Sequence, residues 1–207
     1  TTAMPYDVSV VGYRNNVTNT LRLWSAEPSS QHLPENIEFQ EYLTDLKRIS
    51  HGLYPNDSTE DGRLLRLKQQ YFLVSAGLQS ACRAHYRRYG TFSNFAEKYV
   101  FQLNDTHPIL AIHELIRIMM DDYNTSWDEA WTQIQKSMAY TNHTVLQEAL
   151  EKWPIHHVQR LLPRCYMIIE EINRRFNNFL TSINVDENTR RSVAIIKDGI
   201  IHMANLA

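Results

Sequence analysis

The spacing of apolar residues along the chain predicts a protein dominated by helices. The longest regular stretch runs from residue 61 to 89, where apolar side chains recur every three or four positions. They are Leu64, Leu67, Tyr71, Val74, Leu78 and Cys82. This spacing places them on one face of a helix. Gly90 predicts the end of that helix, because glycine accepts a left-handed backbone.

The same periodicity and the positions of prolines predict further helices. One covers residues 41–53 and is broken by Pro55, and another begins at Pro108 with four apolar residues on its inner face, Ile109, Ile112, Ile116 and Met119. Ser126 and Glu129 have the spacing of a capping box, so a helix should follow and end within residues 138–140. After Pro154 we expect two consecutive helices with a break at Pro163.

Strands are predicted in two places. Residues 6–24 are rich in Val, Thr and Tyr, and indicate two short strands joined near Gly12. Residues 99–103 indicate a buried strand that runs into Asn104 and Asp105, whereas 27–37 look like a surface connection. The predicted fold class is therefore α/β and helix-dominated.

Composition excludes several classes of protein. The 207 residues permit one large domain or two small ones, and the 21 basic and 23 acidic residues are interspersed, so no nucleic-acid-binding surface is indicated. No apolar run is long enough to span a membrane. Cys82 and Cys165 lack metal or disulfide spacing, which favours a reducing cytoplasm. Because the chain begins at Thr1 and ends in an apolar run at 200–207, we expect a piece of a longer polypeptide.

Three polar segments carry candidate chemistry. Residues 142–154 combine an amide, an imidazole, a hydroxyl and two carboxylates with a tryptophan, Trp153, that we expect to exclude water from a sugar site. Residues 54–58 and 102–108 carry related groups. Each has a simpler interpretation: a surface turn at 56–58, a helix cap at Asp105 or Thr106, and a buried structural histidine at His143. The histidine spacings do not suit a metal, and neither a glycine-rich phosphate loop nor a serine-nucleophile motif is present.

Together these segments, as YPND (54–57), LNDTHP (103–108) and YTNHTVL (140–146) followed by EALE and WP, closely resemble the glycogen, starch and maltodextrin phosphorylase family. The resemblance extends over nearly all of the chain. It implies part of the N-terminal domain of a two-domain enzyme of the GT-B type, without the C-terminal domain that binds pyridoxal 5′-phosphate.

The resemblance also implies roles for individual residues. His143 is the implied catalytic residue, facing the glucosyl unit with its imidazole at the 6-hydroxyl. The implied substrate-binding residues are Asn56, Asp57, Ser58, Asp105, His107, Thr144, Ala149 and Glu151, with Asp105 orienting His107. Ser58 stands where the animal enzymes have asparagine.

The implied reaction of the parent protein is attack by orthophosphate on the terminal α-1,4-glucosyl bond of a glucan, releasing glucose 1-phosphate. The family uses pyridoxal 5′-phosphate, acts as a homodimer and places its cofactor lysine outside this span, so we expect no cofactor and no activity in this piece alone. Ala84 after Arg83, where animal enzymes have two adjacent arginines, indicates a bacterial-type enzyme. The alternative is a carbohydrate-binding or helical interaction module without a reaction of its own.

Overall fold

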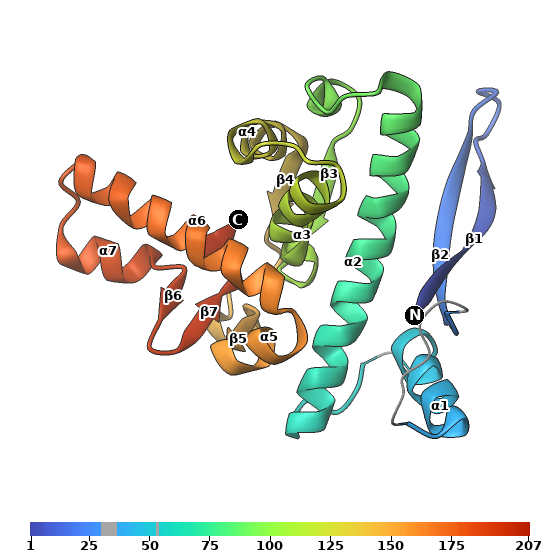
Figure 1. Cartoon of the computed structure of the whole chain (residues 1–207), viewed down its shortest axis with the longest axis horizontal. Helices are drawn as coiled ribbons and strands as arrows, with labels where there is room; N and C mark the ends of the chain where they lie inside the picture. The colour runs from blue at the N-terminus through green and yellow to red at the C-terminus, as the bar shows by residue number, and fades with distance from the viewer. Residues whose placement is uncertain (30–36, 53) are drawn as a thin grey trace. The chain divides into compact units, whose positions relative to one another are not determined.

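The computed structural model describes residues 1–29, 37–52 and 54–207, which form two compact units, Thr1–Ala76 and Gly77–Ala207. The long helix α2 (Glu60–Tyr89) contributes to both. Figure 1 shows the elements of each unit. The predicted connection at 27–37 and the end of the helix predicted for 41–53 fall partly outside the described ranges, at residues 30–36 and 53.

The first unit contains an antiparallel hairpin of β1 (Thr2–Val11) and β2 (Thr18–Glu27), as the alternating pattern predicts. The Asp7 carboxylate and the Arg22 guanidinium pair across the strands at 2.6 Å, on one face. Alternate positions of the strands give the opposite face its apolar side chains, all exposed: Met4, Tyr6, Val8, Val10, Leu21 and Leu23. We call these six residues the hairpin apolar face.

The first unit has a small core beside the hairpin. Helix α1 (Phe39–Ser50) buries Tyr42 and Leu46 against Ala26 at the end of β2, and Phe72 of α2 packs against this cluster. The Ser50 hydroxyl accepts a hydrogen bond from the Ala26 backbone N–H at 3.2 Å. The helix predicted for 41–53 is confirmed over most of its length.

The second unit holds two small sheets. Strands β3 (Phe101–Asn104) and β4 (Met138–Thr141) pair in parallel. The other sheet is antiparallel and three-stranded, in the order β5-β7-β6, from Lys152–Pro154, Ile200–His202 and Ile196–Lys197. Short 3-10 helices lie at Phe95–Glu97, His107–Leu110 (η2) and Gln147–Ala149 (η4).

Helix α3 (Ala111–Arg117) is central to the core of the second unit and continues as a π-helical turn, Ile118–Asp122. It packs against α4 (Trp127–Ser137) and α6 (Pro163–Ser182). The remaining helices are α5 (Ile155–Leu161), α7 (Glu187–Val193) and α8 (Met203–Leu206). The inner-face residues predicted after Pro108 are all buried: Ile109, Ile112, Ile116 and Met119.

Local sequence signals set several helix boundaries. Gly90 has φ +67°, the left-handed conformation predicted for a helix end, and the Ser126 hydroxyl accepts a hydrogen bond from Glu129 N at 3.3 Å. The helical conformation is interrupted between α5 and α6 at Leu162, immediately before Pro163, as predicted. Helix α4 ends at Ser137, one residue before the predicted range of 138–140, and Met138–Thr141 form β4, which pairs with β3.

The described chain is therefore a mixture of helices and small sheets, in agreement with a helix-dominated α/β class. The buried strand predicted for 99–103 exists as β3, but Leu103 is its one fully buried residue. Within the described ranges, every helix is too short or too polar to cross a membrane.

Candidate functional site

Two of the three predicted polar segments meet at the carboxyl ends of the parallel strands β3 and β4. Asn104 pairs with Thr141 at the last position of the register, so the residues that follow each strand emerge side by side. The Asp105 backbone N–H continues the ladder by donating to Thr141 O at 2.8 Å. This is the edge at which parallel α/β sheets present ligand-binding groups. We call residues 104–106, 141–144 and 151 the strand-end site.

Two further hydrogen bonds hold the strand-end site together. His143 Nε2 is hydrogen-bonded to Asn104 Oδ1, which joins the two loops directly. The Thr106 hydroxyl, 1% exposed, accepts from the Glu151 backbone N–H at 3.1 Å. Residues far apart in the sequence are thus fixed against one another, as the interpretation of these segments as one site requires.

Asp105 adopts a conformation that costs energy at a non-glycine residue. Its φ is +76°, and such left-handed residues cost on the order of 1–3 kcal/mol unless their surroundings hold them. Its carboxylate Oδ1 accepts from the adjacent Thr106 N–H at 2.7 Å, and its own N–H is bound to β4. Strain of this kind is concentrated at functional sites.

The helix-cap interpretation of this corner is wrong. Thr106 precedes η2 without a side-chain cap, and its hydroxyl is used by Glu151 instead. The predicted orienting bond from Asp105 to His107 is also absent from the described residues, since the Asp105 carboxylate binds Thr106 N. His107 is exposed and Asp105 is half-buried, so both remain accessible to a ligand.

His143 is exposed, which excludes the interpretation of a buried structural histidine. Asn104 Oδ1 occupies Nε2, so Nδ1 is the ring nitrogen left for a ligand such as a sugar hydroxyl. Asn142 and Thr144 shape the loop: Asn142 Oδ1 accepts from Thr144 N at 3.2 Å, and Thr144 Oγ1 accepts from Leu146 N at 3.0 Å.

Tyr140 and Asn104 are site residues that sequence reasoning did not single out. The Tyr140 hydroxyl is buried and has no hydrogen-bond partner within the described residues. Burial, followed by the negative charge of Asp105, raises the pKa of Tyr140. Both residues lie inside the recognised motifs. The signal that could have identified them is their position at the ends of strands that pair.

The remaining predicted residues of the second unit, Ala149 and Glu151, differ in environment. Ala149 is exposed in η4, and Glu151 is half-buried with its backbone N–H held by Thr106. The expectation that Trp153 walls off an open site is wrong. Its side chain is 2% exposed and belongs to the buried face of the three-stranded sheet, where it pairs with Ile201.

The third segment belongs to the first unit and forms a surface turn there. Asn56 Oδ1 accepts from the backbone N–H and the hydroxyl of Ser58, at 3.1 and 2.7 Å. Arg63 Nε donates to the Asp57 carbonyl at 3.0 Å, which ties the turn to the start of α2. These bonds all join residues of the first unit. The predicted contribution of Asn56, Asp57 and Ser58 to the site stays a prediction.

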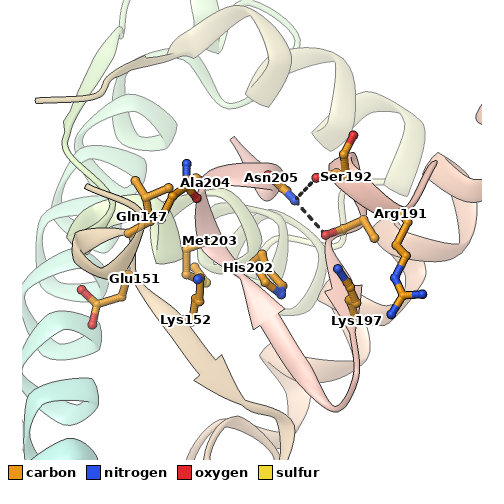
Figure 2. A pocket seen from close by; sticks show the side chains of 12 residues that line it. Gln147, Glu151, Lys152, Arg191, Ser192, Lys197, His202, Met203, Ala204 and Asn205 are labelled. Carbon is orange, nitrogen blue, oxygen red and sulfur yellow. Dashed lines mark hydrogen bonds between the residues drawn. The ribbon is translucent and has the colours of Figure 1, made fainter. Parts of the chain in front are cut away.

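The second unit contains cavities of different character. One, of about 670 Å³, is lined mainly by apolar and aromatic side chains, among them Trp127, Trp131 and Phe176. Another, of about 210 Å³, is bordered by Glu151 and by several cationic side chains (Figure 2). Glu151 is the one predicted site residue that lines either of these cavities.

Comparison with known proteins identifies the family. A family model described as carbohydrate phosphorylase matches residues 1–207. The chain is 46% identical over its whole length to a glycogen phosphorylase of Bacillus subtilis. It is 43% identical over 99% of its length to the muscle form of glycogen phosphorylase from Ovis aries, and 44% identical over 99% to that from Mus musculus.

In each case the chain covers 26% of the relative, about a quarter of its length. The match includes all three polar segments and both strands of the strand-end site. From the whole-length match and these identities, the chain belongs to the carbohydrate phosphorylase family.

Proposed function

We propose that the parent protein is an α-glucan phosphorylase, a glycosyltransferase that transfers terminal α-1,4-linked glucosyl units to orthophosphate and releases glucose 1-phosphate. This chain is part of its N-terminal domain and supplies one wall of the catalytic cleft, in a two-domain enzyme of the GT-B type. The parent acts in the cytoplasm as a homodimer. The supporting observations are the family membership and the strand-end site.

The observation that carries the proposal is the bond between His143 and Asn104. It connects the ends of two parallel strands and leaves the other ring nitrogen of an exposed imidazole available to a ligand. A preorganised group aimed at the sugar stabilises the transition state without reorganising during the reaction. His143 is therefore the proposed catalytic residue.

The other residues of the second unit have binding roles in this proposal. Asp105 and His107 contact sugar hydroxyls, because carboxylate oxygens and exposed ring nitrogens are the acceptors and donors that such groups require. Thr144, Ala149 and Glu151 line the opposite side of the sugar. In the first unit, Asn56, Asp57 and Ser58 form a loop at the cleft.

Pyridoxal 5′-phosphate is the proposed cofactor of the parent, but the lysines of this chain do not suit its aldimine. Five of the six are exposed, and Lys197 is half-buried. Lys152 and Lys197 line the 210 Å³ cavity, which is smaller than typical cofactor sites of about 300–1,000 Å³. In this proposal the cofactor binds to residues outside this span, and phosphorolysis requires the rest of the parent.

The decisive experiment replaces His143 by alanine in the intact parent. Loss of one preorganised donor or acceptor at a reacting centre costs roughly 2–4 kcal/mol, so kcat for glucose 1-phosphate release from maltodextrin should fall about 30- to 1,000-fold. The exposed His51 of α1's C-terminal end provides a matched control, and His51→Ala should retain activity. Near-normal turnover of His143→Ala, with the fold intact by circular dichroism, would refute its catalytic role.

A separate assay distinguishes the phosphorylase from a binding module. The intact parent should release glucose 1-phosphate from maltodextrin and orthophosphate, whereas the 207-residue chain with added pyridoxal 5′-phosphate should release none. If the parent bound maltodextrin without turnover, the module without a reaction would be the better description. Release of glucose 1-phosphate by the 207-residue chain alone would contradict the proposal that essential catalytic groups lie outside it.

A further inference from the structure

The cavity of about 210 Å³ is built on the outer face of the three-stranded sheet. Lys152 of β5 pairs directly with His202 of β7, and Lys197 of β6 pairs with Ile200, two residues before His202. Because alternate residues share a face, these three basic side chains project from the same side of the sheet. Trp153 and Ile201 project from the other side and are buried, which fixes the sheet's orientation.

A fourth cationic group comes from a separate element. Arg191 of α7 lines the same cavity, and its guanidinium is 3.8 Å from the Asp198 carboxylate. Both side chains of that pair are largely exposed, at 67% and 73%, so the ion pair holds the arginine only weakly. Arg191 can therefore turn to an anion without losing a strong interaction.

The charges that line the cavity are not balanced. Lys152, Lys197 and Arg191 carry positive charges, and Glu151 is the one acidic residue of the lining. In Figure 2 the Glu151 side chain lies at the opposite end of the cavity from Lys197 and Arg191. The lining thus has a formal charge of +2, close to the charge of a phosphate group with its sign reversed.

The pKa of His202 is affected by this positive potential. Burial, then the charges of Lys152 and Lys197, lower the pKa of its imidazole, and the opposing effect of Asp198 is smaller. The cavity therefore disfavours another positive charge at its centre. A bound anion would reverse this effect.

We propose that the cavity formed by Lys152, Lys197, Arg191 and His202 binds a phosphate group, either as inorganic phosphate or as part of a small phosphorylated sugar. Its volume suits a phosphate with at most a compact substituent, because drug-sized ligands occupy larger sites. Arginine provides a planar fork for two phosphate oxygens, and the lysines act as point charges. The proposal rests on these four residues, none of which belongs to the strand-end site, although Glu151 borders both.

Calorimetric titration of the full 207-residue chain tests the proposal, with inorganic phosphate and glucose 1-phosphate as separate ligands at low ionic strength. We expect saturable binding that Lys197→Gln and Arg191→Gln each weaken at least tenfold. Lys136→Gln is the matched control, because Lys136 is exposed on α4 and does not line the cavity. Equal affinity for the two ligands would identify the free ion as the ligand, and tighter binding of glucose 1-phosphate would identify the phosphorylated sugar.

A second readout uses the unaltered chain, so it does not depend on how the variants fold. NMR titration of the His202 imidazole should give a higher pKa in saturating phosphate than in chloride at equal ionic strength, because an anion stabilises the imidazolium. An unchanged His202 titration would overturn the proposal. Absence of saturable binding, or equal binding by Lys197→Gln and Lys136→Gln, would do the same.

Discussion

At the residue scale, two neighbouring ionisable residues, His113 and Glu114, are completely buried in the second unit. Their surroundings favour different charge states. The Glu114 carboxylate accepts from Arg117 Nε and Nη2 at 2.8 and 2.9 Å, and from the Cys165 thiol at 3.5 Å. Neither ring nitrogen of His113 has a hydrogen-bond partner in the described chain. The carboxylate is therefore stabilised in its charged form, whereas the histidine is held neutral.

The first prediction concerns the pH dependence of stability. Burial lowers the pKa of His113 to about 4, against 6.5 in the unfolded chain. Between pH 6.5 and pH 4, His113 is protonated in the unfolded state but stays neutral in the folded state. The folded state therefore loses stability as the pH falls, and this loss levels off near pH 4. Between pH 7.5 and pH 5 this group should cost about 2 kcal/mol.

Urea denaturation of the chain and of His113→Leu at both pH values measures this contribution. The variant should lose less stability on acidification, because it has no group to protonate at that position. The control His51→Gln changes an exposed histidine and should lose as much stability on acidification as the unaltered chain. Identical pH slopes for His113→Leu and the unaltered chain would show that other groups cause the effect.

A second prediction follows from the Glu114 ion pair. Arg117→Met leaves a fully buried carboxylate without its main partner, and broken buried pairs cost about 3–5 kcal/mol. Arg174 offers a comparison, since it makes the same i, i+3 pair with Glu171 on the surface of α6. Arg174→Met should leave the urea midpoint nearly unchanged. A comparable loss in both variants would contradict the assigned role of burial.

At the scale of the element, helix α2 contains two glycines with opposite requirements. A Cβ at Gly62 would lie 1.7 Å from the Asn56 carbonyl oxygen, so the turn at 54–58 and the first turn of the helix fit together only with glycine. A Cβ at Gly77, farther along the same helix, would meet no atom within 4 Å. The same substitution should therefore have opposite effects at the two positions.

Gly62→Ala should destabilise the chain by roughly 1–3 kcal/mol, because the backbone of the turn must move. Gly77→Ala should stabilise it by about 0.5–1 kcal/mol through helix propensity. Thermal or urea denaturation of the two variants gives both values. If Gly62→Ala were as stable as Gly77→Ala, the turn would have to be free to shift away from α2.

Helices were largely predictable from the sequence because their signals are local. The period of apolar residues lies within each helix, and Gly90 and the Ser126 cap lie next to the helix ends that they set. The strand β4 could not be predicted from the sequence, because residues 138–141 directly follow α4 and become a strand only by pairing with β3. The two-residue β6 and three-residue β7 carry too few positions to show a period, and depend on each other and on β5.

The contacts within the candidate site were not predictable from the sequence, and the roles of its residues stay predictions. The family motifs identify His143, Asp105 and Glu151, but not the contacts that fix them. Asn104 holds His143, and Thr106 holds the backbone of Glu151, through pairings across segments that are distant in the sequence. The expected bond between Asp105 and His107 fails because a left-handed Asp105 turns its carboxylate to Thr106.

At the scale of the whole molecule, the chain is two compact units that share α2, and the larger one carries the strand-end site and the cavity of about 210 Å³. Family membership accounts for the first of these features. The second follows from the order of strands β5-β7-β6, which gathers basic residues from three strands onto one face. The two features can be tested separately, by turnover in the parent and by binding in the chain.

The hairpin apolar face determines how the chain behaves at high concentration. Val8 and Leu21 face each other across the strands and are 49% and 51% exposed. A two-stranded hairpin with an exposed apolar face and open edges is a template for self-association. The chain should therefore form soluble oligomers or precipitate as its concentration rises, and Leu21→Glu should raise the threshold measured by light scattering. Thr20→Glu adds the same charge to the opposite face and should raise it less, whereas equal effects would indicate net charge as the cause.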